Sequence, residues 1–450
     1  MAHIVIATNG LRGLLNASLA LARRLQADGH RLTCAATIDV AASVEAHGFA
    51  YSQLPDSMAA RERAVAADAA DGAGYVRKWR RLTQRRAAVL DAMAAPTLQR
   101  ALRAWRADLL LIDVELHELI MVARADGARI GLLQAWMSTW PHGRMPPLHR
   151  SDRPGHGWTG HASVIRAQWL RHRLRTARVD GQAYLRSAGL SWPALLHAFA
   201  DAVGFDRRRH VDAGLWQIPF GYRDMPIGIL HARELDFPAP VPAYVRYLGP
   251  MIDRDRPESG DAAAEQACTV ALQAIRARGQ RLIYGGFGSM FTAERGFIER
   301  LFAAMAARAD WALVLSLGGQ RADDLPAGAP DNVHVLPWVP QLRVLAEADA
   351  ALQHGGINTL EECIELAVPS VVYSGGFRDM PGSAARIAHH GLGAVGDRHK
   401  DNPATIVARL AQVMTSAAIR RNLSAMRRVT RRYEQERVAE QWVASLLRRP

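Results

Sequence analysis

The chain has 450 residues, of which 49% are hydrophobic and 22% are charged. This length and composition fit two folded domains and exclude a disordered chain. The three cysteines lie far apart in the sequence, so neither a disulfide framework nor a zinc site is predicted.

The formal net charge is +13, carried mostly by arginine. The aromatic and glycine spacing of an RNA-binding sheet is missing, so no nucleic acid partner is expected. Arginines cluster in two helical stretches, 164–178 and 420–432, which leaves peripheral contact with an anionic membrane surface open. The N-terminus lacks signal-peptide features, and no apolar run is long enough to span a membrane. We therefore expect a cytoplasmic protein, with the inner face of the membrane as a place of contact.

The chain opens with alternating strand and helix patterns. Residues 3–7 and 31–36 are short apolar runs, and residues 15–27 between them have helical periodicity. This order predicts the start of a doubly wound α/β sheet. Residues 57–106 are rich in Ala, Arg and Leu and predict helices. The next apolar strand, over 108–113, ends in an acidic residue.

A helix is predicted over 116–125 and a strand over 129–133. The following segment, 135–160, is irregular, and long loops of this kind are often functional. It contains three tryptophans, Trp136, Trp140 and Trp158. We expect these indoles either to line an apolar pocket or to belong to the ordinary core. Helices are predicted over 162–204.

The stretch 226–250 is rich in proline and 253–261 is polar, so the link between the two domains is predicted there. A second α/β series follows. Its strands are predicted over 282–287, 311–315, 333–336, 350–353 and 370–373, and its helices over 292–308, 342–347 and 358–367. The predicted division of the chain is a first domain over 1–245, a linker over 246–261, a second domain over 262–430, and a C-terminal helix over 431–450 that packs back toward the first domain.

The motif richest in chemistry lies where a strand ends in His354-Gly355-Gly356 and a helix begins at Asn358 or Thr359. Two glycines allow a tight turn and a close approach to a ligand. Free amides at a helix N-terminus favour an anion, typically a phosphate, and His354 adds a hydrogen-bond donor. Upstream, Trp338 offers a flat face to a nucleobase. Glu362, one turn into the helix, can accept two bonds from a ribose diol.

This segment resembles the nucleotide-sugar signature of family 1 glycosyltransferases, the UDP-glycosyltransferase-like enzymes of the GT-B fold. The likeness is greatest to bacterial members that glycosylate lipophilic aglycones, carotenoid glucosyltransferases among them. It continues through residues 365–369 and 379–386, and residues 286–289 are similar to the loop that contacts the phosphates. The resemblance implies an α/β fold of two facing Rossmann-like domains with a deep cleft between them.

The resemblance also implies a role for each matching residue of the donor site. Trp338 stacks on the base, the region of Val339 and Gln341 bonds the base or ribose, Glu362 holds the ribose, and Asp379 bonds the sugar. The pyrophosphate is held by Ser289, His354, Gly356, Asn358 and Thr359. The expected donor-binding set also includes Gly288, Gly355, Arg378 and Met380. The nucleoside diphosphate sugar is a co-substrate, and no cofactor is expected.

The chain departs from the family pattern at the general base. The family usually has a histidine after the first strand that takes the acceptor proton, and Leu14 stands in that region here. Asp113 matches the carboxylate that orients this histidine. It is either the base itself, with Glu115 or His117 as neighbours, or a cap for the helix over 116–125. His142 is a further candidate base, unless it is a solvated loop residue.

A second departure concerns the donor sugar. The family Asp-Gln pair reads Asp379-Met380, and methionine cannot bond sugar hydroxyls. Either the sugar is not glucose, with a deoxy sugar as the hypothesis, or Arg378 compensates.

These residues together predict an inverting, metal-independent transfer from a UDP or TDP sugar to a hydroxyl or similar nucleophile of a lipophilic small molecule or lipid. No Asp-x-Asp pair or His/Cys cluster suggests a metal site. Two alternatives stay open: a GT-B partner protein that binds nucleotide sugar without transferring it, and a sugar-nucleotide epimerase of the same fold. The chain is expected to be a monomer or a homodimer.

Overall fold

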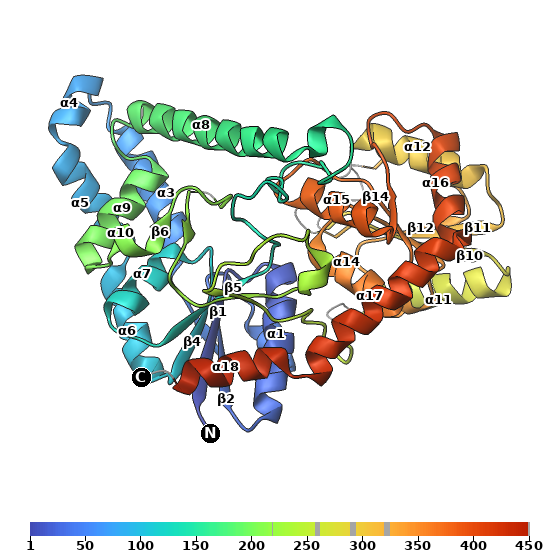
Figure 1. The fold of residues 1–450 in the computed structure, drawn as a ribbon, viewed down its shortest axis with the longest axis horizontal. Coiled ribbons are helices and arrows are strands. Elements are labelled where there is room, and N and C mark those ends of the chain that lie inside the picture. Colours follow the sequence, from blue (N-terminus) through green and yellow to red (C-terminus); the bar gives the residue numbers. More distant parts are fainter. Residues whose placement is uncertain (218, 257–261, 289–293, 319–324, 449–450) are drawn as a thin grey trace.

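The computed structural model describes residues 1–217, 219–256, 262–288, 294–318 and 325–448. It contains two parallel β-sheets, one formed by the first half of the chain and one by the second half. Helices pack on both faces of each sheet (Figure 1). The doubly wound α/β architecture predicted from the sequence is confirmed. No helix within these ranges is long and apolar enough to cross a bilayer.

The first sheet has seven parallel strands in the order β3-β2-β1-β4-β5-β8-β9. Every residue of β1 and β4 is buried, as expected for central strands covered on both faces. The strands are β1 (His3–Thr8), β2 (Arg31–Ala36), β3 (Ala50–Gln53), β4 (Leu109–Asp113), β5 (Ile130–Gln134), β8 (Ile227–Ile229) and β9 (Val245–Tyr247).

Helix α1 (Arg12–Ala27) covers one face of this sheet, and α6 (Ala95–Trp105), α7 (His117–Ala125) and α9 (Trp192–Val203) cover the other. The predicted helical region 57–106 forms four helices, α3 to α6. The remaining elements of this half are α2 (Ala41–Ala46), α3 (Ser57–Ala70), α4 (Tyr75–Arg80), α5 (Leu82–Ala92), η1 (Trp158–Gly160), α8 (Ala162–Arg186), α10 (Arg207–His210), η2 (Arg233–Leu235) and the antiparallel pair β6 (Val211–Asp212) and β7 (Gly221–Tyr222).

The proline-rich stretch 226–250 is not a linker, contrary to the expectation, because it contributes β8 and β9 to the first sheet. Pro226 stands just before β8, where its missing N–H breaks no ladder bond. Its carbonyl accepts a hydrogen bond from the backbone N–H of Leu132 at 2.8 Å. Residues 257–261 of the predicted linker lie outside the described residues.

The second sheet has six parallel strands in the order β12-β11-β10-β13-β14-β15. They are β10 (Arg281–Gly286), β11 (Trp311–Ser316), β12 (Val333–Leu336), β13 (Ala350–Gln353), β14 (Ser370–Val372) and β15 (Gly393–Val395). The helices of this half are α11 (Ala262–Ala277), α12 (Arg295–Ala306), α13 (Gln341–Glu347), α14 (Ile357–Leu366), α15 (Met380–His390), α16 (Pro403–Thr415) and α17 (Ala417–Gln435).

The last helix, α18 (Val438–Arg448), crosses back onto the first sheet (Figure 1). It packs over two strand glycines. A Cβ atom at Gly131 would lie 2.6 Å from the Leu446 side chain, and one at Gly228 would lie 3.0 Å from the Trp442 ring. Glycine at these strand positions therefore permits the close approach of the helix.

Candidate functional site

The turn between β13 and α14 is built around two glycines. Gly355 has φ +94°, a conformation that favours glycine, and a Cβ atom on it would lie 2.9 Å from the Met380 carbonyl oxygen. The His354 ring packs between two other glycines. A Cβ atom on Gly288 or Gly356 would lie 2.8 Å or 2.5 Å from its Nε2. The strand, turn and helix predicted here are confirmed.

The helix starts earlier than expected. Its N-cap is Gly356 and its first residue is Ile357, so neither Asn358 nor Thr359 caps it. Because glycine has no side chain, no side-chain hydrogen bond covers the amides of the first turn. The N-terminus of α14 therefore presents free N–H groups, which suits an anion.

The N-terminus of α1, in the first half of the chain, lies close to the N-terminus of α14, in the second half. A Cβ atom on Gly13, in the first turn of α1, would lie 2.8 Å from Nδ2 of Asn358. Helix α1 also lacks a side-chain cap, since Leu11 occupies its N-cap position. Two uncapped helix starts thus converge at the junction of the two sheets. Their dipoles add at this point.

His354 is buried, and burial lowers its pKa to about 4. Its Nδ1 donates to the Gly286 carbonyl oxygen at 3.4 Å. In the neutral ring Nε2 is then an acceptor, so His354 does not offer the expected donor in the ligand-free protein. Protonation of Nε2 would restore that donor.

Gln341 and Glu362 come together beside this turn. The Gln341 side chain donates to Glu362 Oε2 at 2.5 Å and to Thr359 Oγ1 at 3.2 Å, and it accepts from the Tyr284 hydroxyl at 2.8 Å. Arg256 pairs with Glu362 Oε1 at 2.7 Å. A carboxylate has about four lone-pair sites, so Glu362 keeps acceptor capacity for a further donor.

The other predicted nucleoside residues differ in their surroundings. Trp338 is half-buried and lies in the loop between β12 and α13, three residues before Gln341. The Val339 side chain belongs to the core, so only its backbone is free to contact a ligand. Ser289 lies outside the described residues, while Gly288, directly before it, has φ +81°.

The predicted sugar-binding residues follow β14. Arg378 has φ +50° and donates across the junction to Glu115 at 2.5 Å, and its guanidinium lies 5.5 Å from the Trp136 ring centroid. Asp379 makes no capping bond to α15, and burial raises its pKa. The Met380 side chain is buried, where its backbone packs on Gly355, so it does not bond a sugar hydroxyl.

Asp113 ends β4 and is buried. Its Oδ1 accepts from the Glu115 backbone N–H at 3.0 Å, whereas its Oδ2 finds no hydrogen-bond partner among the described residues. Burial, then the Glu115 charge, raise its pKa well above the usual range. It does not cap the next helix, because α7 begins at His117 with Leu116 as its N-cap. Leu14 is buried in the apolar core, as a leucine should be.

His117, expected as a neighbour of Asp113, and His142, the further candidate base, lie in other surroundings. His117 bonds the Tyr222 hydroxyl through Nδ1 at 2.8 Å and packs among aromatic rings, and burial lowers its pKa to about 3. His142 is part of a local turn and accepts from the Arg144 backbone N–H at 3.1 Å. Within the described contacts, neither ring is joined to Asp113. Glu115, in contrast, links Asn9 at 3.1 Å with Arg378.

The three tryptophans of the irregular segment do not form one pocket wall. Trp140 is in the core and donates to the Pro240 carbonyl oxygen at 3.0 Å. Trp158 is 79% exposed in a 3-10 helix. Trp136 lies at the junction, between Arg378 and Trp216, whose ring is edge-on at 6.3 Å.

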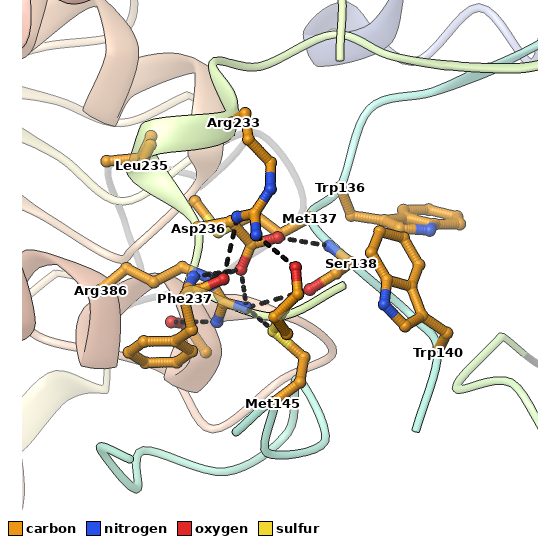
Figure 2. A network of polar contacts seen from close by, with 12 residues as sticks. Trp136, Met137, Ser138, Trp140, Met145, Arg233, Leu235, Asp236, Phe237 and Arg386 are labelled. Atoms are coloured by element: carbon orange, nitrogen blue, oxygen red, sulfur yellow. Dashed lines mark hydrogen bonds and ion pairs between the residues drawn. The ribbon is translucent and has the colours of Figure 1, made fainter. Parts of the chain in front are cut away.

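A buried ion pair joins the two halves next to this site. Arg386 of α15 bonds Asp236 through Nε at 2.8 Å and Nη2 at 2.5 Å (Figure 2). Asp236 also accepts from the Ser138 and Phe237 backbone N–H groups and from the Tyr247 hydroxyl. Burial works to raise the Asp236 pKa, but these partners hold it below the usual range.

Sequence reasoning missed this pair and a second one, between His231 and Glu361 at 3.1 Å. Arg386 lies in the segment 379–386 that carried the family resemblance, which was a signal of its importance. Its partner is 150 residues away, and nothing in a single sequence pairs the two.

The comparisons with known proteins agree with this geometry. Residues 299–439 match the family model of the erythromycin biosynthesis protein CIII-like C-terminal domain. Oleandomycin glycosyltransferase of Streptomyces antibioticus is 32% identical over 92 residues, which are 20% of this chain and 21% of the relative. A sterol 3-beta-glucosyltransferase of Sclerotinia sclerotiorum is 22% identical over a segment that covers 82% of this chain and 24% of the relative's length. The chain thus spans about a fifth to a quarter of the length of these relatives.

Solved structures match nearly the whole chain. The glycotransferase of kitacinnamycin has a TM-score of 0.66 at 23% identity, with 98% of this chain and 97% of that one covered. Spinosyn rhamnosyltransferase SpnG complexed with thymidine diphosphate has a TM-score of 0.58 at 16% identity, covering 98% and 100%. Os79 from O. sativa in complex with UDP has a TM-score of 0.61 at 16% identity, with 98% of this chain and 99% of that one covered. These matches do not show the expected closeness to carotenoid glucosyltransferases. The chain therefore has the GT-B fold of these glycosyltransferases, and residues 299–439 match the erythromycin biosynthesis protein CIII-like C-terminal domain.

Proposed function

We propose that the chain transfers a sugar from a nucleoside diphosphate sugar, with UDP or TDP as carrier, to a hydroxyl of a lipophilic small molecule. The observation that carries this proposal is the convergence of two uncapped helix N-termini at Gly13 and Asn358, beside the His354 turn. Free amides and the positive ends of two helix dipoles at one point suit a diphosphate. The complexes of two structural relatives with thymidine diphosphate and UDP support the same ligand class.

The proposed reaction inverts the anomeric carbon. The acceptor oxygen attacks this carbon, the bond from carbon to the diphosphate oxygen breaks, and the electron pair leaves on the diphosphate. The helix starts of α1 and α14 stabilise the growing negative charge, which is preorganised electrostatic catalysis. Approach of the diphosphate also favours the protonated form of His354, so Nε2 becomes a donor to the leaving group. Because these groups supply the positive field, we expect transfer to proceed without an added metal.

The proposed nucleoside site is the Trp338 face together with Gln341 and Glu362. Its support is the network in which Gln341 holds Glu362 next to the first turn of α14. The ribose hydroxyls donate to the remaining lone pairs of the carboxylate. The ion pair with Arg256 holds the Glu362 carboxylate in place, so the ribose meets a fixed and charged acceptor.

Asp113 is proposed as the group that accepts the acceptor's proton. Its support is the unpartnered Oδ2 at the carboxyl end of β4, on the junction side marked by the Glu115–Arg378 bridge. The raised pKa makes this carboxylate a stronger base than an ordinary aspartate. Trp136 is proposed to contact the apolar acceptor, and Arg378 with Asp379 to contact the donor sugar.

The test has two stages. UDP and TDP binding is measured by calorimetry for the wild type, Glu362→Ala and the control Glu299→Ala, whose side chain is exposed on α12. We expect Glu362→Ala to weaken binding by about 1–3 kcal/mol, the cost of lost hydrogen bonds to a charged group, and the control to bind normally. Unchanged affinity in Glu362→Ala would remove the ribose role.

In the second stage, labelled UDP and TDP sugars are incubated with lipophilic hydroxylated acceptors, with and without EDTA. A transferase releases nucleoside diphosphate only when an acceptor is present. Nucleotide binding without turnover would indicate a binding partner protein, and Leu14 at the usual base position favours that alternative. An altered sugar on the nucleotide would indicate an epimerase. Asp113→Asn should lose turnover while keeping nucleotide affinity.

A further inference from the structure

Helix α8 carries a stripe of exposed apolar side chains. It has 25 residues and runs along the upper edge of the molecule in Figure 1. Leu170, Leu174 and Leu185 are 58%, 62% and 57% exposed. At 100° per residue these positions, with Gly181 between them, fall within about 60° of one another on the helix surface. Near the N-terminal end of α8, the opposite side of the helix packs on the protein through Ile165 and Trp169.

Basic residues border this stripe. Six arginines and a single acidic residue, Asp180, occur in the helix. The arginines are Arg166, Arg171, Arg173, Arg175, Arg178 and Arg186, and all six are exposed. In the part of the chain that the structure describes, none of the six forms an ion pair, so their charges are free to meet an external partner.

The same face extends onto α4. The Tyr75 hydroxyl donates to the Leu185 carbonyl oxygen at 2.9 Å, which fixes α4 beside the C-terminal end of α8 (Figure 1). Tyr75 and Val76 are 52% and 64% exposed, and α4 ends in Arg77, Lys78 and Arg80. Apolar and basic side chains thus continue together from one helix to the next.

We propose that α8 and α4 form a docking face for an anionic lipid bilayer, with the leucine stripe entering the headgroup boundary and the arginines meeting the lipid phosphates. Helices of this kind, with leucines on one side and arginines around them, lie in the plane of a membrane surface. The second arginine-rich helix, α17, differs because it packs across α14, buries Ile419 and Leu423, and engages Arg431 with Glu365.

A second copy of the chain does not suit this face. Packing α8 against α8 would bring two sets of six unpaired arginines together, and like charges at close range oppose association. A surface of anionic phosphates has the complementary charge. Each arginine near such a surface strengthens partitioning roughly fivefold at low salt.

The test is co-sedimentation with vesicles, which requires no turnover and so stands apart from the transferase assay. Vesicles of phosphatidylcholine alone are compared with vesicles that contain about 30% phosphatidylglycerol, at about 0.1 M and about 1 M salt. We expect binding to the anionic vesicles only, with a large loss at high salt.

Two variants separate the components of the face. Leu170→Ser, Leu174→Ser and Leu185→Ser remove the stripe, and Arg171→Gln, Arg175→Gln and Arg178→Gln remove three charges. Either triple variant should bind at least tenfold more weakly. The matched control combines Val270→Ser on α11 with Arg421→Gln and Arg428→Gln on α17, which are exposed in the same way. All six stripe and charge positions are exposed, so circular dichroism and melting temperature should stay unchanged.

The control variant should bind like the wild type. The proposal would be overturned if the wild type bound neutral vesicles as strongly as anionic ones. It would also be overturned if both triple variants bound anionic vesicles as strongly as the wild type. A loss of binding in the control alone would overturn it as well. Dimerisation that the stripe variant abolishes, without vesicle binding, would assign the face to a second copy, and binding of a labelled RNA in place of vesicles would assign it to nucleic acid.

Discussion

The buried pair between Asp236 and Arg386 gives the sharpest prediction about how the two halves are held. Their side chains are 0% and 1% exposed. Replacing Arg386 with methionine keeps much of the volume but leaves a buried carboxylate without its counter-ion. Removing one partner of such a pair typically costs about 3–5 kcal/mol.

The surroundings of Asp236 place the expected loss of unfolding free energy near the lower end of that range. Three donors other than Arg386 remain on the carboxylate, at 3.0, 2.8 and 2.8 Å. We therefore expect Arg386→Met to lower the free energy of unfolding by about 3 kcal/mol. Asp236→Asn together with Arg386→Met removes the stranded charge and should recover at least about 1 kcal/mol of that loss.

Urea denaturation followed by tryptophan fluorescence and circular dichroism provides the measurement, with coincident transitions required before a free energy is extracted. The control is Arg295→Met, whose pair with Glu299 is exposed at both ends, and its effect should stay below about 0.5 kcal/mol. A loss in Arg386→Met no larger than in the control refutes the reasoning. So does a double variant as unstable as the single one.

The difference in unfolding free energy between the wild type and Arg386→Met should change with pH in a definite direction. The Asp236 pKa is held below its ordinary value of about 3.9, so the pair contributes stability above that pH and loses it as the pH falls through the folded-state pKa. The gap between the wild type and Arg386→Met should therefore be largest near neutrality. It should shrink below about pH 4.

Three further predictions concern the candidate site. Gly288→Ala should weaken UDP binding and lower the melting temperature more than Gly279→Ala, because both residues have positive φ but only at Gly288 does a Cβ meet His354. The His354 pKa is lowered to about 4, so its contribution to stability is full above about pH 6.5 and falls as the pH drops toward 4; in His354→Gln denaturation curves this part of the pH dependence should vanish. A double-mutant cycle of Glu115→Gln and Arg378→Ala should give a coupling of at most about 1 kcal/mol in unfolding free energy, since Arg378 is 43% exposed, and a larger value would mean a more buried bridge.

The parts of the fold predicted from sequence are those with local signals. Strands β1, β4 and β13 are continuous apolar runs, and the turn after β13 is marked by two glycines, so element type and order followed directly. Strands β8 and β9 escaped prediction because each has three residues in a proline-rich stretch. They become strands only through pairing with β5 and with each other, and pairing is a tertiary property.

The candidate site divides in the same way. His354, Gly356 and Glu362 were placed together because one strand, turn and helix carries them. Arg256 and the Glu115–Arg378 bridge were not foreseen, since each joins residues more than 100 positions apart. His117 was expected as a neighbour of Asp113 from its place in the sequence, and His142 was a further candidate base because it lies in the irregular segment. The direction of a side chain two or more residues past a strand end depends on packing. The His117 ring packs against Trp192 and Phe220, and no contact that the structure describes joins it to Asp113.

Helix α14 shows why the anion site and the junction of the two halves depend on each other. Three buried carboxylates project from its ten residues: Glu361, Glu362 and Glu365. Glu361 meets His231 of the first half, Glu362 meets Arg256, and Glu365 meets Arg254 and Arg431.

Burying three carboxylates in one short helix is costly unless each is paired, so their pairing ties α14 to three directions at once. Electrostatic stabilisation of a leaving diphosphate requires donors fixed before the reaction. The N-terminus of α14 meets that requirement because its helix is held at its sides, and the uncapped first turn is left free for the ligand.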